Sequence, residues 1–571
     1  MKLKLLIIPL TLIILLTACS SGDSEQNETN NVMPSSADGF TQIEEKAAPD
    51  ETTDLACYVE EETYCAYYYY SYEEVPLCEP LIFSREELIL ENVLRIANVR
   101  RQLIHETDME RIYSWIAARE PKIIDATRLV DSTRRNNLTA EQAAYDIRTL
   151  FLLMRHMYAA YHYFGGDEVF IPIMEEMLEE ISGRERWTDD RLFSLIQDRL
   201  GPIIIDKHFI INRYSGSTFN NPQNTFVWNE PFDRSERGFQ KRATGLYVSY
   251  VYGHDIYELF RLTVNEAGEF FYAPVILRPS SLGTTYSLHI TFEDGGQETI
   301  NLTRTTYERA HARGASSSLR FRNSIPIVCI RRMGNAFNPY AVTHNMALRV
   351  LSYIEYLRDE PVFIVDIRSN EGGASAFSYQ WMGHLVGEVV PPNLNWLGFF
   401  DSRIHIPPEQ SAPQRWYRHF TQRAGARFEY PPELFGRYLH MDFIAENIKF
   451  TAEEARARVV PNDQLIIVLI DRFTLSSGEI FADQFTNLEN TLIIGQNTFG
   501  MLLTSSGRAL YLPYSGMPVS MGQYMLVHPE GTWTDGIGLA PDVWVIGDAL
   551  TAALNMLDGF FDVHQDIHNV W

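Results

Sequence analysis

The stretch Leu465–Phe485, "LIIVLIDRFTLSSGEIFADQF", contains the pattern that decides the fold. It opens with an unbroken apolar run, which is typical of a strand buried on both faces of a sheet. Ile480, Phe481 and Phe485 follow at the spacing of a helix that buries one face. A buried strand that leads through a short turn into a helix indicates an α/β domain with a mostly parallel sheet.

Two adjacent serines, Ser476 and Ser477, lie at this strand-to-helix turn. A helix N-terminus collects backbone N–H groups without helical partners and the positive end of the helix dipole. Such a place stabilises a developing oxyanion, so a serine there is a candidate nucleophile. The alternative is a simple helix cap, because Ser476 and Glu479 have the spacing of a capping box.

Short buried strands and helices also alternate on both sides of this turn. Strand-like runs occupy Ile325–Met333, Pro361–Arg368 and Thr491–Gly495, and Asn345–Asp359 has helical periodicity. We therefore predict an α/β core over residues 323–550, followed by a C-terminal tail over 551–571.

The region before the core changes its periodicity once. Residues 83–202 have helical spacing, and Thr139 with Gln142 fits a capping box, so we predict an N-terminal helical domain of about four helices. Residues 203–322 predict a β-rich module, in which Thr285–Arg304 alternates around an Asp-Gly-Gly turn as a hairpin does. The predicted fold class is a multidomain α/β protein.

The N-terminus reads "MKLKLLIIPLTLIILLTACSS", a basic start, an apolar run and a small residue before cysteine. This is a bacterial export signal over residues 1–18, and its "LTAC" ending resembles a lipobox. The ending predicts cleavage before Cys19 and lipidation of its thiol; a plain signal peptide or a membrane anchor is the alternative. We expect a membrane-anchored lipoprotein on the cell surface or facing the periplasm, with a flexible tether over 19–55 and a Cys/Tyr-rich segment over 56–82.

Four cysteines remain after Cys19. They are Cys57, Cys65, Cys78 and Cys329. Disulfides form in exported proteins, but four cysteines allow three pairings and the sequence does not choose among them. The spacing lacks paired CxxC units and a nearby histidine, so we predict no metal and no cofactor.

Composition narrows the class of partner. The formal net charge of −26 repels phosphate backbones, so a nucleic-acid partner is not expected. Aromatic residues make up 12% of the chain, which predicts packed globular domains rather than disorder.

Four motifs, taken in order, resemble the family of tail-specific (C-terminal-processing) peptidases and the related tricorn core. They are Asp366–Gly373 ("DIRSNEGG"), Thr474–Glu479 ("TLSSGE"), Ile494–Gly500 ("IGQNTFG") and Asp535–Asp542 ("DGIGLAPD"). The resemblance covers about Ile325 to Val545. It implies a core of the ClpP/crotonase-like type, no cofactor, and a serine-type peptidase that acts on peptides or unfolded proteins.

The resemblance also implies roles for residues. The family's nucleophile stands three residues before the motif's glutamate, which is Ser476 before Glu479. Its oxyanion hole consists of a backbone N–H at the glycine pair, Gly372 or Gly373, and the N–H of Ser477.

The base is where the chain departs from the family. A serine hydroxyl needs a positioned base, and the processing peptidases supply a lysine directly after "TFG". Met501 occupies that position here, and no lysine follows Lys449. The tricorn-like branch instead carries a histidine after a helical segment and before the core. His208, in "IIIDKHFIINR", has that placement, and histidine suits general-base work near neutral pH.

Further departures keep alternatives open. Lys207 stands where the tricorn core has a serine before its histidine; it is a candidate partner for Asp206, or itself a base if burial lowers its pKa. Asp206 is a candidate for orienting the imidazole. Asp535 replaces the family's late glutamate and is expected to support the proton network.

The β-rich module is either a degenerate PDZ domain or a different β module, because no carboxylate-binding Gly-Leu-Gly-Phe loop is present. An extended peptide that adds to a sheet edge is then the simpler mode of substrate binding. Met501 and Lys207 favour a second hypothesis, a catalytically inactive peptide-binding or scaffolding lipoprotein. A non-peptide hydrolase on the same core is a third.

Overall fold

The computed structural model describes most of the chain between residues 85 and 563. The described ranges are 85, 88–101, 124–125, 136–211, 223–279, 284–304, 310, 316–334, 343–387, 390, 392, 395–398, 404–405, 459–504, 510–522, 524–527 and 536–563. The predicted signal peptide, the lipidation site Cys19, the tether, Cys57, Cys65, Cys78 and Asp535 lie outside these ranges, so they remain predictions.

The core is built on parallel strands in sequence order β14, β15, β18 and β19, followed by β23. Their bounds are β14 (Ile325–Cys329), β15 (Val362–Asp366), β18 (Leu465–Ile470), β19 (Thr491–Gly495) and β23 (Val543–Ile546), with β13 (Ser318–Arg322) antiparallel to β14 at one edge. Every residue of β15, β18 and β19 is buried. The continuous apolar runs therefore have the role that the sequence predicts for them, and the mixed α/β fold class is confirmed.

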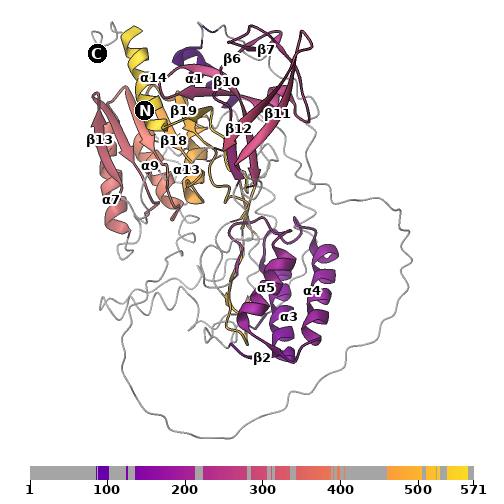
Figure 1. The fold of residues 1–571 in the computed structure, drawn as a ribbon. Helices are drawn as coiled ribbons and strands as arrows, with labels where there is room; N and C mark the ends of the chain where they lie inside the picture. Colours follow the sequence, from indigo (N-terminus) through magenta and orange to yellow (C-terminus); the bar gives the residue numbers. More distant parts are fainter. Residues whose placement is uncertain are drawn as a thin grey trace, which may run out of the picture. The chain divides into compact units, whose positions relative to one another are not determined.

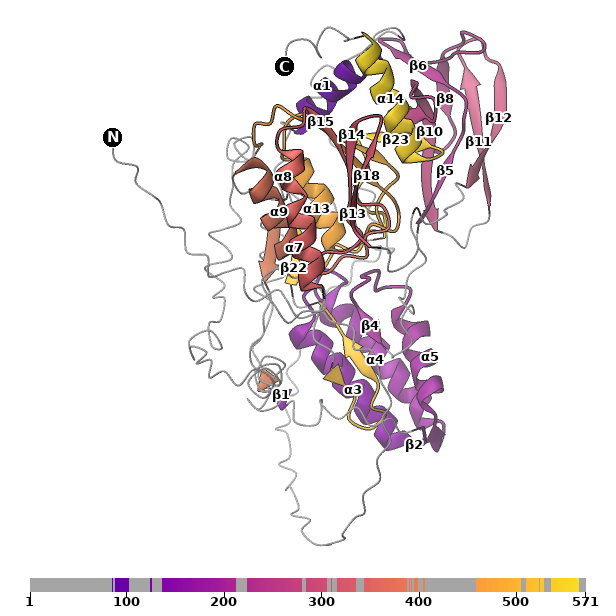
Figure 2. The same ribbon diagram turned by 90° about the vertical axis from the view of Figure 1, so that its left-hand side faces the viewer.

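Helices cover both faces of this sheet (Figure 2). On one face lie α7 (His344–Ser352), α8 (Ile354–Leu357), α9 (Ala376–Val386) and α13 (Ser477–Phe485); on the other lie α1 (Leu90–Arg101) and α14 (Ala549–Val563). Successive side chains of β18 point to opposite faces of the sheet. Ile466 packs with the helices of the first face, and Ile467 packs with α1 and α14 on the second.

The β-rich region continues the same sheet, because β9 pairs in parallel with β23. Its elements are β5 (Gln223–Val227), β6 (Phe232–Ser235), β7 (Gly238–Lys241), β8 (Val248–Val251), α6 (Ile256–Leu259), β9 (Phe260–Asn265), β10 (Phe270–Pro279), β11 (Thr285–Phe292) and β12 (Gln297–Arg304). The predicted hairpin is present as the pair β11–β12, with Gly295 at a positive φ of 83° in its turn.

In the described part of the helical region lie α3 (Ala140–Met157), α4 (Gly166–Ser182) and α5 (Asp189–Leu200) (Figure 1). The capping box of Thr139 and Gln142 is present at the start of α3. The helical region differs from the expectation in one respect: α1 packs on the core sheet beside α14 instead of on α3–α5.

A hairpin from the far end of the chain completes this helical core. It comprises β20 (Leu510–Tyr511) and β21 (Pro518–Ser520), and β21 pairs with β4 (Ile210–Ile211). Leu503, Leu512 and Val519 are buried among the side chains of α3–α5. The carboxylate of Asp146 in α3 accepts the backbone N–H of Ser515 at 2.7 Å. The hairpin therefore fixes β4, and with it the residues just before β4.

The remaining described strands form short pairs. They are β1 (Ile124–Asp125) with β17 (Ile404–His405), β2 (Leu138–Thr139) with β3 (Arg186–Trp187), and β16 (Asn395–Gly398) with β22 (Tyr524–Val527). Among the helices that the structure describes, none combines the length and apolar character that crossing a bilayer needs.

Candidate active site

Ser476 lies at the turn between β18 and α13, where its backbone has φ 53° and ψ −121°. A non-glycine residue with this positive φ is strained, and such strain concentrates at functional sites. The backbone N–H of Ser476 donates to Glu479 Oε2 at 2.7 Å, and the predicted capping box is present. The Ser476 side chain also lies beside a histidine: its Oγ is 3.2 Å from His208 Nε2.

His208 reaches this serine across 268 residues of sequence. It follows α5 and precedes β4, and its side chain is buried with 4% exposure. Burial lowers the pKa of the imidazole to about 4, with a backbone group of Thr504 acting in the opposite direction. The ring is therefore neutral at pH 7 and able to accept a proton. Its Nδ1 is buried and makes no hydrogen bond of normal geometry within the described ranges.

Asp206 holds the backbone of His208 rather than its ring. Oδ1 accepts the His208 backbone N–H at 2.9 Å, and Oδ2 accepts the hydroxyls of Tyr158 at 2.8 Å and Thr504 at 2.7 Å. Burial raises the pKa of Asp206 to about 6, against the lowering effect of these three hydrogen bonds. The sequence predicted that Asp206 orients the imidazole of His208. In the structure it contacts the His208 main chain instead.

Lys207 is fully buried between these two residues. Its ammonium lies 4.3 Å from the centre of the Phe499 ring, a cation–π contact to the "TFG" loop. All three residues of the turn 206–208 therefore contact the core: Asp206 at Thr504, Lys207 at Phe499 and His208 at Ser476.

The glycine pair lies directly against the nucleophile turn. A Cβ placed on Gly372 would come within 2.8 Å of the Leu475 carbonyl oxygen and 3.0 Å of Ser476 Cβ. The hydroxyl of Ser477 donates to the Gly373 carbonyl at 2.8 Å, which joins the two loops.

The backbone N–H groups of Gly373 and Ser477 have no acceptor among the described residues, whereas that of Gly372 has one. The Gly372 N–H donates to Asn370 Oδ1 at 2.8 Å, so it is occupied. Met333 forms two backbone hydrogen bonds with this loop: its N–H donates to the Gly372 carbonyl, and its carbonyl accepts the N–H of Ala374. The N–H of Gly373 takes part in neither. The Ser477 N–H is the first of α13 and has no partner within the helix. Of the residues proposed from the sequence, Gly373 and Ser477 therefore fit an oxyanion hole better than Gly372.

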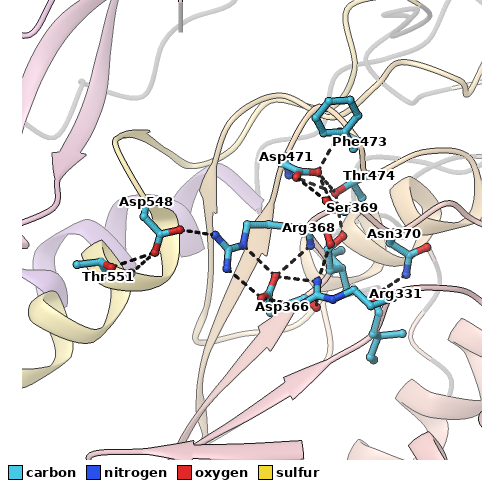
Figure 3. Close-up of polar contacts among 12 residues, drawn as sticks. Arg331, Asp366, Arg368, Ser369, Asn370, Asp471, Phe473, Thr474, Asp548 and Thr551 are labelled. Atoms are coloured by element: carbon cyan, nitrogen blue, oxygen red, sulfur yellow. Dashed lines mark hydrogen bonds and ion pairs between the residues drawn. The ribbon is translucent and has the colours of Figure 1, made fainter. Parts of the chain in front are cut away.

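A buried ionic network supports both loops (Figure 3). The Asp366 carboxylate binds Arg331 at 2.8 Å and Arg368 at 3.0 Å, and Arg368 continues to Asp548 at 2.8 Å. Nearby, Asp471 accepts the backbone N–H of Ser369 at 2.8 Å. These contacts fix the ends of β15 and β18, from which the glycine loop and the nucleophile turn begin.

Glu479 joins the nucleophile turn to the "TFG" loop. Its Oε1 accepts the Thr498 hydroxyl at 2.6 Å and the Gly500 N–H at 2.8 Å, and its Oε2 accepts the Met501 N–H at 3.0 Å. Burial raises the pKa of this carboxyl while the four hydrogen bonds lower it. Glu479 therefore holds the nucleophile turn and the "TFG" loop together.

The last motif reaches the same loop. The N–H of Gly536, next to Asp535, donates to the Gly500 carbonyl at 2.9 Å, and the Leu539 N–H donates to the Thr498 hydroxyl at 2.7 Å.

Cys329 is buried as a free thiol at the end of β14. Within the described ranges, no group of three or more His, Cys, Asp or Glu side chains is arranged to hold a metal ion.

Residues 417–545 match the sequence model of peptidase family S41. This segment of the chain resembles peptidase family S41. The matched residues include the Ser476 turn, the "TFG" loop and the "DGIGLAPD" motif, while the glycine pair and His208 precede them. The predicted resemblance to tail-specific peptidases is thereby confirmed, and with it the enzyme class, a serine-type peptidase.

Several solved structures are similar to this chain. Mature CPAF is 14% identical with a TM-score of 0.36, covering 75% of this chain and 98% of its own. The photosystem II D1 C-terminal processing protease is 12% identical, with a TM-score of 0.31 and coverage of 70% and 92%. The tricorn protease is 15% identical, with a TM-score of 0.29 and coverage of 74% and 35%. No curated protein matches the chain in sequence.

Proposed function

We propose that this protein is an exported, lipid-anchored serine peptidase that hydrolyses peptide bonds in extended or unfolded polypeptides. Ser476 is the nucleophile and His208 is the general base in place of the family's lysine. The observation that carries the proposal is the 3.2 Å separation of His208 Nε2 and Ser476 Oγ. That distance is within reach of direct proton transfer between a base and its nucleophile.

The reaction follows from the positions of these groups. Ser476 Oγ attacks the carbonyl carbon of the scissile bond while His208 Nε2 takes the hydroxyl proton. The backbone N–H groups of Gly373 and Ser477 stabilise the oxyanion that forms. His208 then returns the proton to the leaving amine, and water hydrolyses the acyl-enzyme by the same route.

Asp535 is assigned the supporting role in this network. An imidazole with a pKa of about 4 is a weak base at rest, so a carboxylate that favours the imidazolium would strengthen it. The buried Nδ1 of His208 is the atom at which such a group would act. The backbone N–H of Gly536, the residue after Asp535, donates a hydrogen bond to the carbonyl of Gly500 in the "TFG" loop. Leu502, two residues after Gly500, is buried.

Anchoring and localisation follow from the N-terminus. The "LTAC" ending supports lipidation of Cys19 and attachment to a membrane by an acyl chain, followed by a flexible tether. Peptide or unfolded-protein substrates are the class expected of a family S41 peptidase.

The test of this function is cleavage of one substrate protein in two states. The full-length protein, Ser476→Ala and a matched control, His254→Ala in the β-rich region, are each incubated with the substrate folded, or reduced and alkylated. Wild type and His254→Ala should cleave the unfolded form, and Ser476→Ala should not. Cleavage by Ser476→Ala at the wild-type rate would refute the nucleophile.

Other outcomes are equally informative. Equal cleavage of folded and unfolded substrate would refute the substrate class. No cleavage by a folded wild type would favour the peptide-binding lipoprotein, to which Met501 in the position of the lysine points.

A further inference from the structure

Two buried carboxylates hold opposite ends of one short segment, Gly500–Thr504. At its start, Glu479 accepts the backbone N–H groups of Gly500 and Met501. At its end, Asp206 accepts the hydroxyl of Thr504 at 2.7 Å. Neither carboxylate is exposed by more than 1%.

Each carboxylate also holds one member of the candidate catalytic pair. Glu479 accepts the backbone N–H of Ser476 at 2.7 Å, and Asp206 accepts the backbone N–H of His208 at 2.9 Å. The contacts therefore close a ring from Ser476 through Glu479, the 500–504 segment and Asp206 to His208, and back to Ser476 through the 3.2 Å contact.

The segment between the carboxylates is itself fixed by packing. Leu502 is buried against Ile480 of α13, whereas Leu503 is buried in the core of the helical region. A third donor, the hydroxyl of Tyr158 at the end of α3, fixes the Asp206 carboxylate from the helical side. Displacement of the Thr504 hydroxyl would therefore reach His208 through Asp206, beside the direct effect of the Thr504 backbone on the imidazole.

We propose that Asp206, with Thr504 as its donor from the core, is the positioning residue that sets His208 at hydrogen-bond distance from Ser476. This inference depends on the proposed function, in which His208 is the base. In the processing peptidases that this chain resembles, the residue after "TFG" is itself the base. Here the same segment would act indirectly, by fixing the histidine that replaces the lysine.

The contact affects geometry more than it affects the charge of the base. Asp206 touches the main chain of His208 and leaves the ring nitrogens to other groups. Loss of the Thr504 hydroxyl should therefore slow the reaction by moving the base, and a displacement of about 1 Å can reduce a rate on the order of 100-fold.

The test uses Thr504→Val, which keeps the shape and removes the donor, with Thr504→Ser as the variant that retains it. The readout is the rate at which a fluorophosphonate probe labels the full-length protein, normalised to the folded fraction. Thr504→Val should slow labelling on the order of 10- to 100-fold, and Thr504→Ser should recover most of the rate. Equal rates for Thr504→Val and wild type would overturn the inference. Tyr158→Phe, which removes another donor to Asp206, takes its place if Thr504→Val does not fold.

A double-mutant cycle separates positioning from general support. Thr504→Val is combined with His208→Ala, and both His208→Ala proteins are assayed with the same added imidazole to keep their rates measurable. A residue that acts through His208 should have no further effect once His208 is absent. An equal slowing in both backgrounds would overturn the inference. A His208→Ala protein that labels as fast as wild type would instead refute the proposed base.

Discussion

Gly373→Ala is the substitution that most directly perturbs the proposed oxyanion hole. Gly373 has a φ of 134°, which side-chain-bearing residues rarely adopt, and an added Cβ would lie 2.1 Å from the Met333 carbonyl oxygen. That oxygen belongs to the backbone, so the glycine loop has to move. The movement would carry the Gly373 N–H away from Ser476.

The expected cost has two parts. The backbone strain is of order 1–3 kcal/mol of folding free energy. The loss of one oxyanion donor costs about 10²- to 10³-fold in rate. Gly387→Ala is the matched control, because Gly387 also has a positive φ, of 83°, but no atom within 4 Å of its added Cβ. This control should lose only about 1–2 kcal/mol of stability.

The assay pairs urea unfolding with the rate of fluorophosphonate labelling per folded molecule. Gly373→Ala should lose both stability and labelling rate, whereas Gly387→Ala should lose stability alone. If Gly373→Ala folds and labels at the wild-type rate, the oxyanion hole does not include Gly373 and the reasoning is wrong.

Two further predictions concern the base and the ionic network. Burial lowers the pKa of His208 to about 4 and a carboxylate at Nδ1 would raise it part of the way back, so the acid limb of kcat/KM for peptide cleavage should have its midpoint below the ordinary histidine value of 6.5. An acid limb with its midpoint at the ordinary histidine value of 6.5 would contradict the buried imidazole. Asp366→Asn leaves Arg331 and Arg368 buried with a weakened partner, so urea unfolding should show a loss of about 3–5 kcal/mol. Glu293→Gln, in an exposed ion pair, should lose less than about 1 kcal/mol, and equal losses in the two variants would refute the argument.

The parts of the fold that local patterns encode could be predicted from the sequence. The apolar run of β18 is buried on both sides, and the turn after it positions Ser476 at the start of α13. The capping box at Thr139 and the β11–β12 hairpin are also local, because the residues that form them are close in sequence.

The assembly of the site depends on contacts that no local pattern encodes. His208 is adjacent to Ser476 because β4 pairs with β21, more than 300 residues later in the chain. Strands of two or three residues, such as these, have too few positions to show a period. The spacing of Asp366 and Arg368 hints at their ion pair, but Arg331 joins it from the segment after β14 and has no sequence signal of its own.

Activation of Ser476 by His208 is best tested by site-resolved labelling. The full-length protein, His208→Ala and the control His254→Ala are treated with a fluorophosphonate probe, digested and examined by mass spectrometry. The account predicts an adduct on Ser476 in the wild type and the control, and its loss or strong slowing in folded His208→Ala. An adduct on a different residue, or an unchanged rate in His208→Ala, would contradict the account.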